Sequence, residues 1–166
     1  MACWSIAKRS PAELRQRLGE ATTQALARDL QPIPGVLEAL KAISYRKCVA
    51  SGSDARRVHV SLACTGLLEY FAPHIFTREE VGRGKPAPDL FLHAAERMHS
   101  RPSRCLVIED SVAGVQAALA AGMCVLGFVG GSHCAADRAE ALRAAGAARV
   151  FDCMRRLPAL SAELHP

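Results

Sequence analysis

The stretch from Cys105 to Met123 constrains the fold of this chain more than any other part of the sequence. It opens with four apolar residues, continues with two adjacent carboxylates, Glu109 and Asp110, and then enters an alanine-rich run that begins at Ser111. A short continuous apolar run is typical of a strand that is buried on both faces of a parallel sheet. Because charges are costly to bury, we expect both carboxylates where the strand emerges, at its carboxyl end.

Glu109 and Asp110 admit two interpretations. Open α/β sheets bind ligands at the carboxyl ends of their strands, and adjacent carboxylates repel each other unless a cation or a shared proton relieves the repulsion. Since the stretch offers only oxygen ligands, the first interpretation is a bound Mg²⁺. In the second interpretation, Asp110 or Ser111 caps the helix that follows. The stretch alone favours neither.

The composition indicates a globular protein of one domain, with 50% hydrophobic and 22% charged residues among 166. No apolar run approaches the roughly 20 residues that span a bilayer, and the first residues lack the hydrophobic core of a signal peptide. The seven cysteines are odd in number and form no Cys-x-x-Cys pair, which favours a reducing compartment. We therefore expect a cytoplasmic protein with no membrane partner.

The charge pattern bears on the partners of the chain. A net charge of +5 is spread along the sequence, and aromatic residues make up 5% of it. This offers no stacking platform for a nucleic acid, so we expect an anionic small molecule instead. The oligomeric state does not follow from the sequence.

Strands alternate with helices along most of the chain, which predicts an α/β fold with a parallel sheet and flanking helices. The first helix is expected to begin with Ser10 as the N-cap and Pro11 at the first helical position. A junction between structural units is expected at 32–35. The expected helices span 10–29, 36–43, 54–65, 88–98, 111–121, 137–145 and 153–164. The expected strands span 47–50, 74–76, 105–108, 123–128 and 149–151.

Small and hydroxyl residues follow the strand at 47–50, beginning with Ser51 and Gly52. They leave the backbone open to a ligand, and the start of the next helix adds N–H groups that favour an anion. The alternative is an ordinary strand–helix junction in which Ser53 or Asp54 serves as the N-cap.

A third candidate is Lys85, which is followed by prolines at 86 and 88. The prolines fix the backbone and so restrict the position of the ammonium, which suits the neutralisation of a phosphate or an anionic nucleophile. An ordinary surface lysine is the alternative. The spacing is not that of a Walker A loop.

In a parallel sheet, Ser51, Lys85 and the two carboxylates would lie at one edge. A hydroxyl, an ammonium and a metal are together what phosphoryl transfer requires, because they position the group and neutralise its oxygens.

Three motifs resemble those of the haloacid dehalogenase superfamily: Ala-Ser at 50–51, Gly-Lys-Pro-Ala-Pro-Asp at 84–89, and Val-Ile-Glu-Asp-Ser-Val-Ala-Gly at 107–114. The chain is most similar to the subgroup of beta-phosphoglucomutase and small sugar-phosphate phosphatases. The resemblance implies a Rossmann-like core at 32–166 and a remnant of a helical cap at 1–31. It also implies a small phosphorylated metabolite as the substrate.

The resemblance implies roles for the site residues as well. Ser51, with Gly52, would bind the transferring phosphoryl group, and Lys85 would bridge that group to the nucleophile. Glu109 and Asp110 would hold Mg²⁺.

The family's first motif, Asp-x-Asp-Gly-Thr, supplies the nucleophile and the general acid/base, and no Asp-x-Asp occurs in this sequence. In the family that motif ends the central strand, between the strands that end at Ser51 and Asp110. We therefore expect an N-terminally truncated Mg²⁺-dependent sugar-phosphate phosphatase without its first strand, inactive as it stands. The alternatives are a non-catalytic remnant that binds a phosphorylated ligand or a partner protein, and an unrelated α/β binding domain.

Overall fold

The computed structural model describes residues 28, 30–132, 134–135 and 137–164. The expected helix at 10–29, and with it nearly all of the expected cap remnant, lies outside the described residues. No helix in the described part of the chain is long and apolar enough to cross a membrane.

The order of helices and strands follows the alternation in the sequence. The α-helices are α2 (Val36–Ala42), α3 (Ala55–Cys64), α4 (Leu68–Phe71), α5 (Asp89–Arg97), α6 (Val112–Ala120), α7 (Arg138–Ala144) and α8 (Leu157–Leu164). The strands are β1 (Val49–Ser51), β2 (Ile75–Thr77), β3 (Leu106–Glu109), β4 (Cys124–Phe128) and β5 (Arg149–Phe151). Short 3₁₀ turns cover Arg78–Glu80, Pro102–Arg104 and Met154–Arg156.

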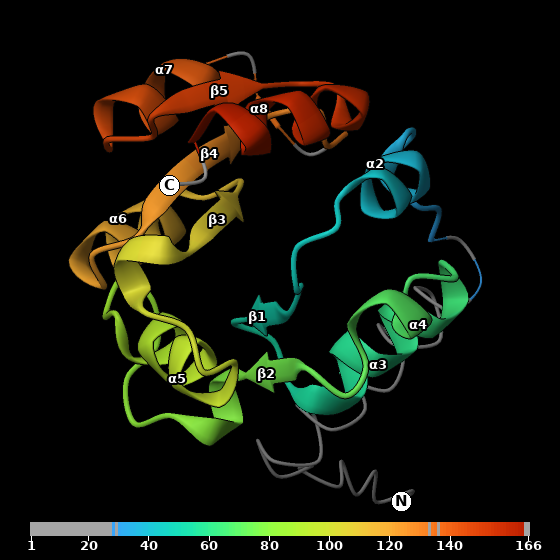
Figure 1. Cartoon of the computed structure of the whole chain (residues 1–166), viewed down its shortest axis with the longest axis horizontal. Coiled ribbons are helices and arrows are strands. Elements are labelled where there is room, and N and C mark those ends of the chain that lie inside the picture. Colours follow the sequence, from blue (N-terminus) through green and yellow to red (C-terminus); the bar gives the residue numbers. More distant parts are fainter. Residues whose placement is uncertain (1–27, 29, 133, 136, 165–166) are drawn as a thin grey trace, which may run out of the picture.

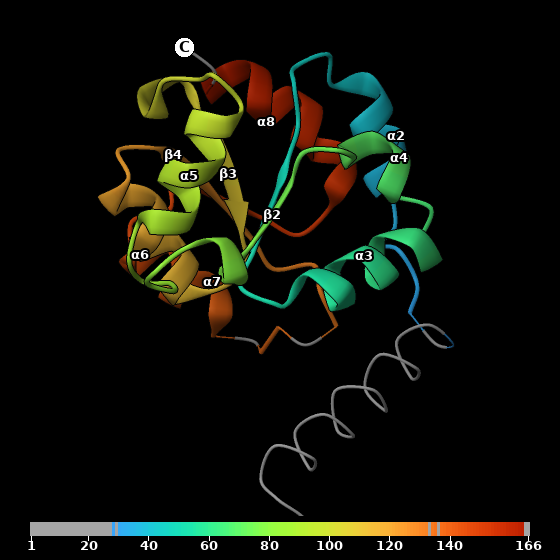
Figure 2. The ribbon, with the colours of Figure 1, turned by 90° about the horizontal axis from the view of Figure 1, so that it is seen from below.

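The described strands form two separate parallel sheets. β1 pairs with β2, and β4 lies between β3 and β5 in the second sheet. Figure 1 shows the pair β1 and β2 apart from β3, β4 and β5, and Figure 2 shows helices around the strands. The predicted α/β class with parallel strands and flanking helices is confirmed.

The three-stranded sheet has an apolar core on each face. One core joins the sheet to α5, α6 and α7 and contains the fully buried Val115 and Leu142. The other joins it to α2 and α8 and contains Leu126 and Phe151. With helices packed on both of its faces, the three-stranded sheet is the middle layer of three.

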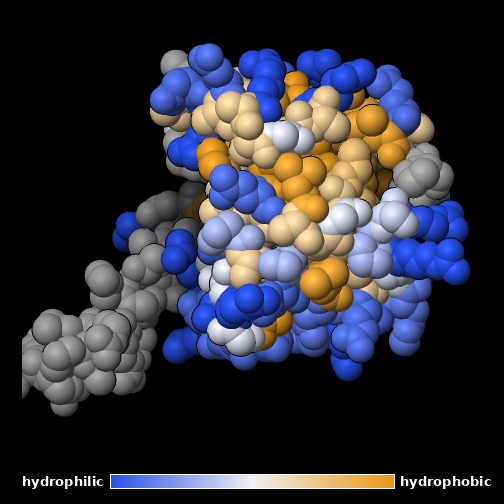
Figure 3. Space-filling model, turned by 90° about the vertical axis from the view of Figure 1, so that its left-hand side faces the viewer, coloured by the Kyte–Doolittle hydropathy of each residue, from blue (hydrophilic) through white to orange (hydrophobic). Residues whose placement is uncertain are grey.

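The outer surface on the α5–α6 side carries apolar patches among charged side chains (Figure 3).

The strand preceding Glu109 is less buried than the sequence predicts. Val107 is 9% exposed, but Ile108 is 39% exposed, and all three residues of β1 are half-buried. The expectation of a strand buried on both faces is therefore wrong at Ile108. The physical reason is that a cavity of about 890 Å³, rather than another described strand, separates β3 from β1.

One helix was not expected. Leu68–Phe71 forms the single turn α4, closed by a 2.9 Å hydrogen bond from the N–H of Ala72 to the carbonyl of Leu68. Four residues are too few to show a helical repeat of apolar positions, so periodicity could not reveal this turn.

Candidate functional site

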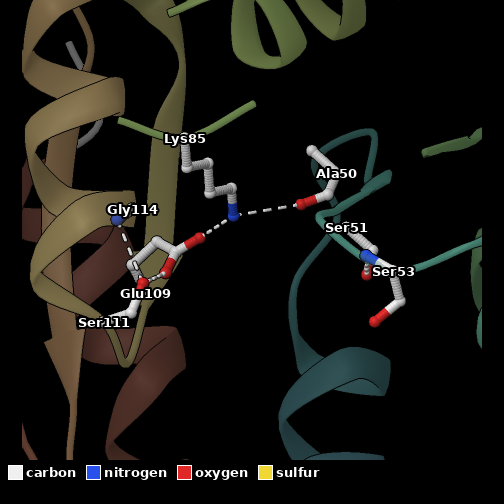
Figure 4. Close-up of polar contacts among 7 residues, drawn as sticks. All are labelled: Ala50, Ser51, Ser53, Lys85, Glu109, Ser111 and Gly114. Carbon is white, nitrogen blue, oxygen red and sulfur yellow. Dashed lines mark hydrogen bonds and ion pairs between the residues drawn. The ribbon is translucent and has the colours of Figure 1, made fainter. Parts of the chain in front are cut away.

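Three separate segments bring the predicted site residues to one end of the two sheets. Ser51 is the last residue of β1, Lys85 precedes α5, and Glu109 is the last residue of β3. Figure 4 shows the Lys85 side chain lying between Glu109 and the backbone of Ala50. The expected convergence of these residues is present in the structure.

Lys85 joins the two sheets. Its ammonium forms an ion pair with Oε1 of Glu109 and donates to the carbonyl of Ala50 at 3.4 Å. The side chains of Lys85 and Glu109 are 17% and 9% exposed, so the charges compensate each other largely out of water. The ammonium also lies 4.7 Å from the ring centroid of Phe91, which favours a cation at this place. This lysine is not an ordinary surface lysine.

Glu109 is held from its other side by Ser111. Oε2 of Glu109 accepts a 3.0 Å hydrogen bond from Oγ of Ser111, and that Oγ accepts the N–H of Gly114 at 3.0 Å. The second bond caps α6, so the interpretation of Ser111 as a helix cap is correct. The same hydroxyl holds the Glu109 carboxylate, so one side chain both caps α6 and positions a candidate site residue.

Gly114 explains how α6 approaches the carboxylate so closely. A Cβ atom at this position would clash with Glu109. Sequence reasoning did not single out this glycine as a site residue. The sequence did carry a signal for Gly114, however. A glycine inside an alanine-rich helix costs about 1 kcal/mol relative to alanine, so it needs a packing reason.

Ser51 ends β1, and its Oγ accepts the N–H of Ser53, in the loop that follows, at 3.2 Å. Asp54 caps α3 by accepting the N–H of Arg57 at 2.8 Å, so the expected cap is present as well. Gly52 is exposed, and no described atom lies within 4 Å of the Cβ that could be added there. The loop therefore leaves room at the end of β1.

The oxygen donors of Glu109 and Asp110 determine which kind of metal ion this site could bind. Asp110 is half-buried beside Glu109, and the described residues contain no group of three or more His, Cys, Asp or Glu side chains suited to a metal ion. Hard oxygen donors suit Mg²⁺, which is commonly held by one or two carboxylates together with water. Glu109 would have to exchange its contact with Lys85 for such an ion.

A cation, a hydroxyl and two carboxylates thus lie at one end of the sheets. A family model described as haloacid dehalogenase-like hydrolase matches residues 7–122, more than half of the chain. The chain belongs to the haloacid dehalogenase-like hydrolases. The resemblance inferred from the three motifs is therefore confirmed.

Individual relatives agree with this family. The chain is 34% identical over 105 residues to 6-phosphogluconate phosphatase of Escherichia coli, covering 63% of this chain and 48% of the relative. It is 36% identical over 115 residues to fructose-1-phosphate phosphatase YqaB of the same organism, covering 68% and 60%. The chain thus spans about half the length of these curated relatives.

A solved structure supports the fold. A conserved haloacid dehalogenase-like protein of unknown function from Agrobacterium tumefaciens superposes with a TM-score of 0.87 at 39% identity, covering 97% of this chain and 73% of that protein. The arrangement of α/β elements is therefore that of the family.

Proposed function

We propose that these residues supply the phosphate-binding and Mg²⁺-binding side of a phosphomonoesterase site that acts on a small sugar phosphate. The observation that carries the proposal is the position of Lys85 between the carboxyl ends of β1 and β3, next to Ser51 and Glu109. Phosphoryl transfer needs positive charge and hydrogen-bond donors around the phosphate oxygens. Two relatives are phosphatases of phosphorylated sugars or sugar acids, which supports this substrate class.

Each side chain then has a role. The ammonium of Lys85 neutralises phosphate oxygens, and the hydroxyl of Ser51 donates a hydrogen bond to one of them, with Gly52 leaving the backbone accessible. Asp110 and Glu109 are the proposed holders of Mg²⁺, which would supply further positive charge to the phosphate. Ser111 and Gly114 position Glu109.

The sequence contains no Asp-x-Asp, the motif that carries the family's nucleophile. We therefore propose that these 166 residues hydrolyse no phosphate ester alone. We also retain the division into a cap remnant at 1–31 and a core at 32–166 without its first strand. That no described strand lies between β1 and β3 supports a core without its first strand.

The test is a chimera. The N-terminal part of the E. coli 6-phosphogluconate phosphatase, including its Asp-x-Asp motif, is joined ahead of the matched region of this chain, and phosphate release from 6-phosphogluconate is measured. We expect no release by the chain alone and Mg²⁺-dependent release by the chimera. Lys85→Ala should lower the rate of the chimera by about 10²-fold or more. Lys41→Ala, on the exposed surface of α2, is the matched control.

A second candidate function is binding of a phosphorylated ligand without hydrolysis. The absence of Asp-x-Asp favours it, since the remaining side chains can bind but lack a nucleophile. A folded chimera that binds phosphate and shows no turnover would support this second function and contradict the first.

A further inference from the structure

The 3₁₀ turn Arg78–Glu80 lies between the segments that carry Ser51 and Lys85. It follows β2, whose last residue, Thr77, is the register partner of Ser51 in the two-stranded sheet. The turn therefore starts at the same end of that sheet as the candidate site. All three of its residues are charged, and we call it the charged turn. The proposed function uses none of them.

Glu80 fixes the charged turn to β2 and to α5. Its Oε1 accepts the N–H of Thr77 at 2.6 Å, and its Oε2 lies 3.2 Å from Nε2 of His93 on α5. Thr77 and Glu80 together form a capping box. The ring of His93 in turn packs edge-on against Phe76, with the ring centroids 5.6 Å apart. The turn thus has a fixed position relative to both elements.

Arg78 reaches from the charged turn to the segment that leads to Lys85. Its guanidinium donates to the carbonyl of Val81 at 2.7 Å and to that of Gly82 at 3.4 Å. The Arg78 residue is half-buried, and hydrogen bonds from a charged donor are stronger than those between neutral groups. The backbone before Lys85 is therefore held around this guanidinium.

Gly84, immediately before Lys85, shows how closely Arg78 lies. A Cβ atom at Gly84 would lie 2.8 Å from Nε and 3.1 Å from Cδ of Arg78. A free arginine side chain would move away from an added methyl group, but this one is held by two backbone carbonyls. Arg78 therefore supports the backbone from which the Lys85 side chain extends to Glu109.

A second contact holds the Lys85 segment from the side of α5. The guanidinium of Arg83 donates to both carboxylate oxygens of Asp89, at 3.0 and 2.9 Å. The Arg83 side chain is 73% exposed, and exposed ion pairs contribute little. We therefore expect Arg78 to be the stronger support of the two.

Glu79 connects the charged turn to the other segment of the site. Its Oε2 accepts the N–H of Ala55, the first residue of α3, at 3.2 Å. A carboxylate at the start of a helix is stabilised by the helix dipole. Ala55 follows the loop in which Oγ of Ser51 accepts the N–H of Ser53. The charged turn thus contacts both the segment after Ser51 and the segment before Lys85.

We propose that the charged turn positions Ser51 and Lys85 relative to each other, with Arg78 as the main positioning residue for the Lys85 ammonium. Groups that are fixed before a ligand arrives lower the cost of ordering them on binding. The positioning stands on the contacts above, whereas its value for a bound phosphate rests on the proposed function. In this role Arg78 acts through the backbone.

The test measures how fast each lysine of the whole chain reacts with acetic anhydride, followed by mass spectrometry of the digested protein. Lys85, held against Glu109, should react more slowly than the exposed Lys41. Arg78→Ala should raise the rate at Lys85 by about fivefold relative to Lys41, because two hydrogen bonds to the backbone before Lys85 are lost. Arg143→Ala, on the exposed surface of α7, is the matched control.

Lys47 distinguishes a local effect from general loosening of the fold. Its Nζ donates to the carbonyls of Ile43 and Tyr45, so it is also partly held. Its rate should not change in Arg78→Ala. A thermal transition of each variant shows whether it folds like the parent chain.

Gly84→Ala provides a second route to the same effect. The added Cβ would displace the Arg78 side chain, so the reaction at Lys85 should again become faster. In the double variant Arg78→Ala/Gly84→Ala the Cβ no longer meets a guanidinium. The rate at Lys85 should therefore equal that of Arg78→Ala alone, whereas two independent effects would multiply.

Glu79→Ala tests the segment after Ser51. Amide hydrogen exchange at Ser53, whose N–H bonds to Oγ of Ser51, should become about threefold faster. Exchange at Val49, whose N–H bonds to the carbonyl of His74 in the sheet, should stay the same.

Three results would overturn the proposal: equal reaction of Lys85 in the parent chain and in Arg78→Ala, multiplied effects in the double variant, or unchanged exchange at Ser53 in Glu79→Ala. None of these measurements involves phosphate. Inorganic phosphate added to the parent chain then tests the proposed function separately, because a phosphate bound to Lys85 should slow its acetylation. If phosphate has no such effect while Arg78→Ala still frees Lys85, the positioning is supported and the phosphate role of Lys85 is contradicted.

Discussion

Lys85 and Glu109 form an ion pair although 24 residues separate them in the sequence, and their side chains are only 17% and 9% exposed. This pair and the Lys85–Ala50 contact connect the two sheets at their carboxyl ends.

Removing the ammonium of Lys85 should lower the stability of the fold. Lys85→Met leaves Glu109 buried beside no countercharge, and we expect the free energy of unfolding to fall by about 3 kcal/mol in urea titrations. The double variant Lys85→Met/Glu109→Gln should recover most of this loss, because the uncompensated charge is gone. Lys41→Met is the control for lysine removal at an exposed site. Equal losses in Lys85→Met and Lys41→Met would contradict the buried pair.

Gly114→Ala tests the close approach of α6. Helix propensity alone would make this substitution stabilising by about 1 kcal/mol. Because the added Cβ would clash with Glu109, we expect destabilisation by about 1–3 kcal/mol instead. The sign of the change in unfolding free energy decides between the two effects.

Ser111 should contribute through its hydroxyl. Ser111→Ala removes the cap of α6 and the bond to Glu109, and we expect a loss of about 1 kcal/mol in thermal or urea unfolding. Ser111→Thr keeps the hydroxyl and should retain most of that stability. If both variants lose the same amount, the hydroxyl is not the cause.

The raised pKa of Cys48 predicts a loss of stability at high pH. Burial raises this pKa from 9.0 to about 11, so the folded chain keeps the proton that the unfolded chain loses in between. The contribution of Cys48 is complete below pH 9 and decreases as the pH rises toward 11, by up to about 1.4 kcal/mol per pH unit. Other groups titrate there too, so the difference between the parent chain and Cys48→Ala is the measurement. Cys64→Ala, at an exposed site, should follow the parent.

The exposed strand edges should make the isolated chain prone to aggregation. Ile108→Lys places a charge on the side of β3 that borders the cavity and should slow aggregation, measured by light scattering, at a cost in stability below about 1 kcal/mol. Leu119→Lys is the matched control, since Leu119 is 41% exposed on α6 and Ile108 is 39% exposed. A sharp thermal transition of a monomeric parent chain would argue against the premise.

The sequence predicted the regular parts of the fold because they follow strong local patterns. The alanine-rich run after Ser111 forms α6, and the apolar run that ends at Phe128 forms β4. Ser51, Lys85 and Glu109 were also expected at one end of the sheet, since the carboxyl ends of parallel strands share an edge.

Contacts between distant segments were harder to predict. The pairing of Lys85 with Glu109 depends on how two segments fold together, and no local pattern encodes it. The exposure of Ile108 has the same origin: an apolar run indicates a buried strand, but burial also requires a neighbour on each side. The metal and phosphate roles of these residues remain predictions.

If Lys85 binds phosphate and Glu109 binds Mg²⁺ as proposed, their mutual contact predicts that the two ions bind cooperatively. An anion that takes Lys85 leaves Glu109 without its countercharge, which strengthens the attraction of Glu109 for a cation. A cation at Glu109 in turn releases Lys85 for the anion. Coupling of this kind is reciprocal, so phosphate and Mg²⁺ should each raise the affinity of the chain for the other by the same factor.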